Sequence, residues 1–198
     1  MDLNDTSTVP GAALPVSQLR DQLRLGSGFA DDTTQDAALE QYLRAAIAMI
    51  EARTGKVVLT RSLALRLRAW RDPRVQPLPV APVAALTAVE LLDRDGAETV
   101  VDPARWRFEP DLHRPRLVAA GAVLPVIPPG GAVRIRFDAG FGAAWDDVPA
   151  DLAQAVLMLA AHYYEYRTET ALGAGCMPFG VTALIERYRP VRITGGRA

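Results

Sequence analysis

The spacing of apolar residues changes in the middle of the chain, and this change limits the folds open to the sequence. Leu63, Leu65 and Leu67 alternate with small or basic residues, which is the two-residue period of a half-buried strand. Prolines crowd the same region, at positions 73, 77, 79, 82, 103, 110, 115, 125, 128 and 129. Because proline donates no backbone hydrogen bond, the region favours short antiparallel strands joined by stiff loops. The further strands are expected at residues 86–92, 99–101, 106–109, 116–119 and 132–138.

Helical periods flank this β region on both sides. Residues 31–34 supply capping oxygens and acidic charge for a helix that should run to Thr54, with Gly55 as its stop. Its expected buried stripe is Leu39, Tyr42, Leu43, Ala46, Ile47 and Ile50. A second long helix is expected from Pro149 to about Thr168. Shorter helices are expected at residues 18–25, after an N-cap at Ser17, and at 181–188.

These patterns together predict an α+β fold in a single domain. The expected architecture is a helical body, made of two long helices plus short N- and C-terminal helices, with an inserted small antiparallel β region. Residues 1–13 would form a flexible arm, 14–55 and 147–188 the helical parts, 56–142 the β insertion and 189–198 an extended tail.

Charge and cysteine content exclude several classes of protein. The net charge is -1 and no long run of like charge occurs, so the sequence lacks the positive charge that is typical of proteins that bind nucleic acid tightly. The single cysteine, Cys176, excludes an intrachain disulfide framework and a zinc site built from clustered cysteines, and it fits a reducing compartment. No apolar stretch is long enough to cross a bilayer, so no membrane partner is expected.

Each residue that could take part in catalysis or metal binding has a simpler explanation as a structural residue. His162 and Glu165 lie three residues apart on the second long helix, a spacing that could hold a metal ion, but a packing or interface role is favoured because no further ligand accompanies them. His113 reads as a loop residue, and Cys176 has no cation beside it to lower its pKa. The acids at 146, 147 and 151 suit a helix start, and the glycine-rich pieces lack the pattern of a phosphate-binding loop. We therefore expect no catalytic residue, no metal and no cofactor.

Two segments instead favour protein contacts. The run Tyr163, Tyr164, Tyr166 and Arg167 cannot place all its aromatic rings on one face of a helix, and tyrosine and arginine are enriched in interfaces. In the tail, apolar and basic residues alternate, which would suit strand addition to a partner or disorder. The interface candidates there are Tyr188, Arg189, Val191, Arg192 and Ile193.

The order of several segments resembles the head-tail connector, or adaptor, proteins of long-tailed phages and gene transfer agents. The likeness runs from the helix ending at Gly55, through residues 78–83 and 93–96, to residues 133–142, 147–155 and 162–167, and finishes at 177–185 and 188–189. The polar arm before Leu14 lies outside it. The match is closest over residues 133–167.

This resemblance implies a structural protein without enzymatic activity. Its subunits would form a dodecameric ring that binds the portal protein of the head and a tail-side stopper protein, and DNA would only pass through the channel. The C-terminal part would dock onto the portal. The protein would be made in the bacterial cytoplasm and reside at the head-tail junction of a virion or phage-like particle. Two alternatives stay open: a small metal-dependent hydrolase that uses His162 and Glu165, and a monomeric interaction or regulatory protein.

Overall fold

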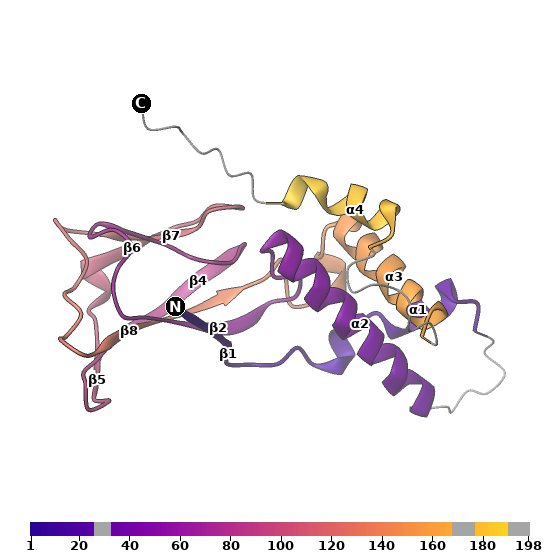
Figure 1. The fold of residues 1–198 in the computed structure, drawn as a ribbon, viewed down its shortest axis with the longest axis horizontal. Helices are drawn as coiled ribbons and strands as arrows, with labels where there is room; N and C mark the ends of the chain where they lie inside the picture. The colour runs from indigo at the N-terminus through magenta and orange to yellow at the C-terminus, as the bar shows by residue number, and fades with distance from the viewer. Residues whose placement is uncertain (26–32, 168–176, 190–198) are drawn as a thin grey trace. The chain divides into compact units, whose positions relative to one another are not determined.

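The computed structural model describes residues 1–25, 33–167 and 177–189, and the chain divides into two compact units. The β unit combines Met1–Val9 with Val57–Ala143, and the helical unit combines Pro10–Lys56 with Ala144–Ala198. Figure 1 shows the strands gathered in the first unit and the α-helices in the second.

The β unit consists of two antiparallel sheets. The larger has the strand order β1 (Asp2–Asp5), β2 (Arg61–Leu67), β8 (Ala132–Ala139), β4 (Val83–Leu92) and β5 (Glu98–Val100). The smaller has the order β3 (Val75–Pro77), β7 (Arg116–Ala119) and β6 (Trp106–Glu109), with a short 3-10 helix at Pro103–Arg105 before β6. Among the described strands, β2 and β8 are the two whose neighbours on both sides come from distant parts of the chain.

Apolar side chains from both sheets share one core. On β8, Val133, Ile135, Phe137 and Ala139 are buried, and the residues opposite the first three on β2 are Leu67, Leu65 and Leu63. Leu117 of β7 belongs to the same buried cluster. Because strand side chains alternate between faces, this pairing places the polar residues of β2 and β8 on the other side of the larger sheet.

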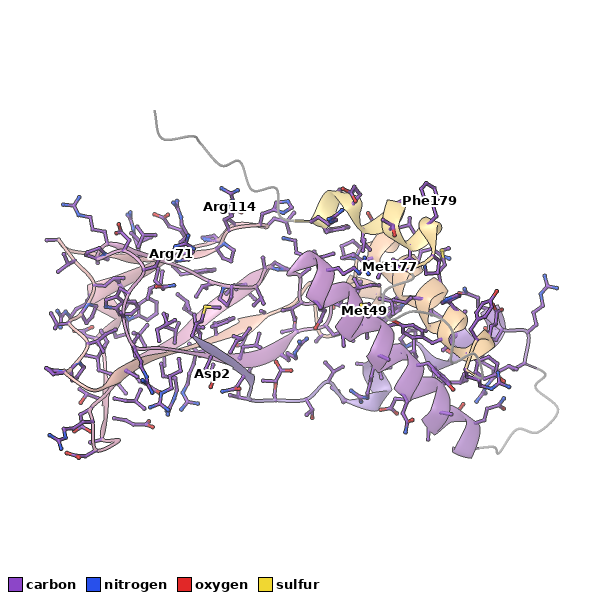
Figure 2. The ribbon with its side chains drawn as sticks, viewed as in Figure 1. Asp2, Met49, Arg71, Arg114, Met177 and Phe179 are labelled. Carbon is purple, nitrogen blue, oxygen red and sulfur yellow. The ribbon has the colours of Figure 1, made fainter. Side chains whose placement is uncertain are left out.

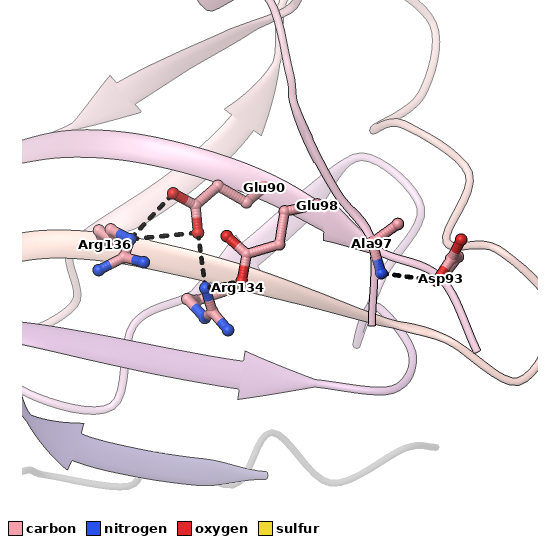
Figure 3. A network of polar contacts seen from close by, with 6 residues as sticks. All are labelled: Glu90, Asp93, Ala97, Glu98, Arg134 and Arg136. Carbon is pink, nitrogen blue, oxygen red and sulfur yellow. Dashed lines mark hydrogen bonds and ion pairs between the residues drawn. The ribbon is translucent and has the colours of Figure 1, made fainter. Parts of the chain in front are cut away.

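That outer face carries a network of ion pairs (Figure 3). Glu90 of β4 is buried and accepts hydrogen bonds from Arg136 Nε at 2.9 Å and Arg134 Nη1 at 3.2 Å. Arg134 also donates to Glu98 of β5 at 2.6 Å. The hydrogen bond to Glu98 raises the pKa of Arg134 further above its usual value, which keeps the guanidinium charged. The buried carboxylate of Glu90 is therefore paired with two opposite charges.

The turn that follows β8 depends on a glycine. Gly140 has a φ of 140° and donates its amide to the Pro82 carbonyl at 3.0 Å. A Cβ at this position would lie 2.4 Å from Thr60 Cα, so no side chain fits against the neighbouring backbone.

We expect Gly140→Ala to destabilise the protein by about 3 kcal/mol, because backbone strain and a clash with backbone atoms add together. Gly121→Ala is the matched control, since a Cβ there meets nothing within 4 Å. Urea unfolding should show a large drop in midpoint for the first variant and nearly none for the second. Equal midpoints would contradict this account of the turn.

The helical unit packs four α-helices: α1 (Val16–Gln22), α2 (Thr33–Thr54), α3 (Ala150–Glu165) and α4 (Phe179–Ile185), counted over its described residues. Single 3-10 turns precede α1 (Gly11–Ala13) and α3 (Trp145–Asp147) and follow α4 (Glu186–Tyr188). Helix α3 contacts each of the other three.

The expected buried stripe of α2 is buried except for Tyr42, which is half-buried, and Gly55 ends the helix with a φ of 66°. The capping residues Asp31 and Asp32 lie outside the described residues.

The prediction of a helical body with a small β insertion is wrong. The strands form two antiparallel sheets with their own core, and these make up one of the two compact units of the chain. The error arose because β3 and the pairing of the two sheets leave no local pattern in the sequence. The prolines do not prevent a second sheet, because Pro77 ends the edge strand β3, where a missing backbone donor costs little.

Two terminal segments also differ from the sequence expectation. Within the expected flexible arm at residues 1–13, Asp2–Asp5 pair with Leu63–Arg66 of β2 as the edge strand β1. Helix α1 begins at Val16, after Pro15, and not after Ser17, because proline is well tolerated at a helix start. The extended tail expected at 189–198 lies outside the described residues from position 190 onward.

Candidate protein-interaction surface

The tyrosines at the end of α3 are held by different neighbours. Tyr164 packs edge-on against Tyr42 of α2, with ring centroids 5.9 Å apart at 87°. The Arg167 guanidinium lies 4.4 Å from the centroid of the same ring and donates to the Tyr164 carbonyl at 2.6 Å. Burial raises the pKa of the Tyr163 hydroxyl, and the positive charge of Arg53 opposes that rise. Tyr166 is exposed.

The structure therefore brings the four interface candidates of this run to one helix end, where Tyr164 and Arg167 stabilise each other. Tyr166 is exposed, and its ring contacts that of His162, with 4.5 Å between the centroids. Their role in binding a partner stays a prediction, because the contacts seen here lie within one chain.

A second cluster fixes the end of the described chain. Tyr188 is only 3% exposed, and its hydroxyl donates to Asp151 Oδ1 at 2.7 Å. Arg187 pairs with Asp151 Oδ2 at 2.8 Å and donates to the Tyr188 hydroxyl. Burial raises the pKa of Tyr188, the Asp151 carboxylate adds to the rise and the bond from Arg187 opposes it. Helix α3 thus holds the 3-10 turn that follows α4.

The other tail candidates divide between the described and undescribed parts. Arg189 is exposed and pairs with Glu186 at 3.1 Å. Val191, Arg192 and Ile193 lie outside the described residues.

The candidates for metal or acid-base chemistry are distributed over separate places. His162 packs against the rings of Tyr163 and Tyr166. Asp147 accepts from the Ala144 amide at 3.0 Å, and Asp151 belongs to the Tyr188 cluster. In the part of the chain that the structure describes, no group of three or more histidine, cysteine, aspartate or glutamate residues could hold a metal ion. Cys176 lies outside that part.

Sequence reasoning missed a small pocket between α2 and the C-terminal segment. It has a volume of about 200 Å³ and is lined by Arg53, Thr182, Ile185 and Arg189. Arg53 lies more than a hundred positions before the other three residues in the sequence, so no local motif marks the pocket. Arg53 alone reads as a charge that favours the C-terminal end of a helix.

Among the described helices, none combines the length and the hydropathy that a transmembrane span requires.

Solved structures similar to this chain are components of particles. One is the neck of an empty GTA particle computed with C6 symmetry, with 58% identity and a TM-score of 0.90. Another is the neck of a native GTA particle computed with C12 symmetry, with 55% identity and a TM-score of 0.85. A third is the virion of a native gene transfer agent (GTA) particle, with 57% identity and a TM-score of 0.86. All three matches cover 100% of both chains.

No family model and no curated protein match the chain. Identity above one half over the full length nevertheless settles the class, which is that of a structural component of a phage-like particle. Within that class, the chain belongs to the family of gene transfer agent neck proteins. The predicted location in a phage-like particle is thereby confirmed.

We expect Tyr188→Phe to destabilise the helical unit by about 1 kcal/mol, because the buried bond to Asp151 is lost. Tyr166→Phe should change the free energy of unfolding little, since Tyr166 is an exposed residue. Urea unfolding followed by far-ultraviolet circular dichroism measures both. An equally large loss of stability in Tyr166→Phe would contradict the role given to the hydrogen bond between Tyr188 and Asp151.

The same pair tests the pH dependence. The pKa of Tyr188 is higher in the folded protein than in the unfolded chain. Its contribution to the free energy of unfolding is therefore fully present below the unfolded pKa of about 10 and is lost as the pH rises through the folded pKa. The stability difference between wild type and Tyr188→Phe should therefore shrink in alkaline solution.

Proposed function

We propose that this protein is the adaptor subunit of the particle neck, which forms a ring between the portal protein of the head and the tail-side stopper protein. The observation that carries the proposal is the full-length similarity to chains from GTA particle necks, one of which was computed with C12 symmetry. Twelvefold symmetry of such a neck supports a dodecameric ring of this chain.

The charges of the described residues support a role as a conduit for DNA. The net charge of the chain is -1, and on the outer face of the larger sheet Arg134 and Arg136 are neutralised by Glu90 and Glu98. Tight binding of phosphates needs arginine or lysine side chains that are available to DNA. A ring of such subunits would let DNA pass without holding it.

The chemistry of the polar groups supports a structural role without enzymatic activity. Tyr188 donates a hydrogen bond to Asp151, and the His162 ring lies tilted against the rings of Tyr163 and Tyr166. These contacts give each group a packing function, and the similar solved chains are structural particle components.

Particles produced without this protein test the proposal directly. Electron microscopy should show heads that are DNA-filled or leaking, together with unattached tails, because the joint between them is missing. Restoring the gene should restore tailed particles. Normal tailed particles in its absence would refute the adaptor role.

The C-terminal segment is proposed to dock onto the portal. Removal of Arg189–Ala198 should weaken portal binding in a pull-down by at least about tenfold, which corresponds to the loss of a few good contacts. Circular dichroism should show an unchanged helix content, since the cluster around Tyr188 is retained. Unchanged portal binding would refute the docking role and leave the neck assignment standing.

A further inference from the structure

Three arginines of the β unit keep their guanidinium groups available on its surface. Arg71, Arg74 and Arg105 are exposed, and within the described ranges their guanidinium groups take part in no ion pair or hydrogen bond. Figure 2 shows the side chain of Arg71 on this unit. Other arginines of the unit pair with carboxylates of the same chain, among them Arg107, Arg116, Arg134 and Arg136. The three unpaired arginines therefore leave positive charge uncompensated.

The smaller sheet brings two of these arginines together. Arg74 comes just before β3 and Arg105 just before β6, and these two strands lie on either side of β7. The Ala119 amide donates to the Arg74 carbonyl at 2.9 Å, and the amide of the next residue, Ala120, donates to the Arg105 carbonyl at 3.1 Å. Since neighbouring strands lie about 5 Å apart, the two arginine backbones flank the end of β7 about 10 Å from each other.

Short hydrogen bonds fix the loop that follows β2 to the loop that follows β7. The Leu124 amide donates to the Pro73 carbonyl at 2.7 Å, and Trp70 Nε1 donates to the Pro125 carbonyl at 2.7 Å. Leu124 and Pro125 are themselves buried. The two loops thus form one fixed surface, which lowers the entropy cost of binding. We call the surface made of residues 70–74, residues 119–126 and Arg105 the arginine surface.

Two exposed valines lie on either side of the buried pair in the arginine surface. Val123 is 50% exposed and Val126 is 80% exposed. A single exposed apolar residue is normal, but apolar side chains beside arginines are typical of protein interfaces, in which arginine is enriched. Duplex DNA presents mainly phosphates to a protein surface, which would leave the valines unused. The arginine surface therefore suits a protein partner better than DNA.

The charge of the arginine surface favours carboxylates on that partner. Asp72 is its one acidic residue, against three arginines. Asp72 Oδ1 accepts the amides of Arg74 at 2.8 Å and Val75 at 3.2 Å, so this oxygen shapes the loop. Positive charge is left over, and hydrogen bonds between guanidinium and carboxylate groups are stronger than those between neutral groups. An acidic partner matches this surface in charge.

A second copy of the chain has few carboxylates to offer. Most of the acidic side chains that the structure describes are already used within the chain. Those paired with arginines include Asp5, Asp36, Glu40, Glu90, Glu98, Glu109, Asp151 and Glu186. Asp93, Asp102 and Asp147 accept backbone amides of their own turns. Charge therefore favours a different protein of the particle.

We propose that the arginine surface binds an acidic segment of another protein of the particle. The carboxylates of that segment meet the three arginines, and an apolar side chain between them packs on Val123 and Val126. The inference needs only that the chain is a component of the particle neck. It does not depend on the ring, on the portal contact of the C-terminal segment or on the conduit role.

Cross-linking of intact particles tests the chemistry of the partner. The chain has one lysine, Lys56, which is only 2% exposed, so Arg74→Lys introduces an accessible amine and keeps the charge. A carbodiimide joins an amine to a carboxylate in contact with it through an amide bond, and the carbodiimide takes up the water that is lost. In purified particles that carry Arg74→Lys, mass spectrometry should find position 74 joined to an aspartate or glutamate of a different protein. Arg105→Lys should be joined to the same protein.

An arginine that is paired within the chain supplies the matched control. Arg107 Nη2 lies 3.1 Å from Glu109 Oε1, so the cross-link formed by Arg107→Lys should stay within the chain. Wild-type particles should give no cross-link from any of these positions.

Charge reversal supplies an independent measurement. Arg71→Glu, Arg74→Glu and Arg105→Glu combined should reduce tailed particles by at least about tenfold, since carboxylates would face carboxylates. Lysine at the same three positions should keep tailed particles within about threefold of wild type, because the charge is retained. Arg94→Glu, in the turn after β4, is the control for a charge change elsewhere on the unit. Thermal unfolding of each purified variant shows whether the β unit still folds, and the cross-link decides where a variant does not.

Cross-links from positions 74 and 105 that are absent, or that reach only other copies of this chain, would overturn the inference. Normal numbers of tailed particles with a folded charge-reversed variant would do the same. A loss of tailed particles without any cross-link to another protein would indicate a contact with DNA phosphates and would also overturn it. None of these results bears on the adaptor role, which fails only if particles lacking the whole chain still carry tails.

Discussion

The β unit depends on the strict alternation of side chains along β8. Val133, Ile135 and Phe137 face the core, and each lies opposite a leucine of β2, so a shift of one residue would expose all three and bury two arginines. The same strand also pairs with β4, which makes it the central strand of the larger sheet. The smaller sheet then completes the core through Leu117.

This alternation has a consequence on the opposite face. Arg134 and Arg136 are forced outward together, and Glu90 between them is nearly buried. A lone carboxylate in that position would be costly, but two guanidinium groups pair it, and Glu98 adds a further acceptor for Arg134. The register that builds the core thus also sets the charge balance of the outer face, which the proposed conduit role uses.

Local patterns predicted individual elements well and their assembly poorly. Helix α2 and its stop at Gly55 followed from periodicity and a glycine that favours positive φ. Strands β6 and β7 were expected with the bounds that the structure shows. The pairing of Asp2–Asp5 with β2 spans some sixty positions and rests on backbone bonds, so the polar side chains of β1 gave no sign of it. The arginine-lined pocket was missed for the same reason: Arg53 meets residues 182–189 only after folding.

The helical unit shows how its polar groups are used once the chain has folded. The Asp151 carboxylate binds Tyr188 and Arg187, and this cluster fixes the end of the described C-terminal segment against α3. With that end anchored and Gly180 packed on Met158, α4 has little freedom, and Phe179 at its start is exposed by geometry and not by fraying. The anchoring of the 3-10 turn by Asp151 and the close packing of Gly180 on α3 thus fix both ends of the segment that contains α4.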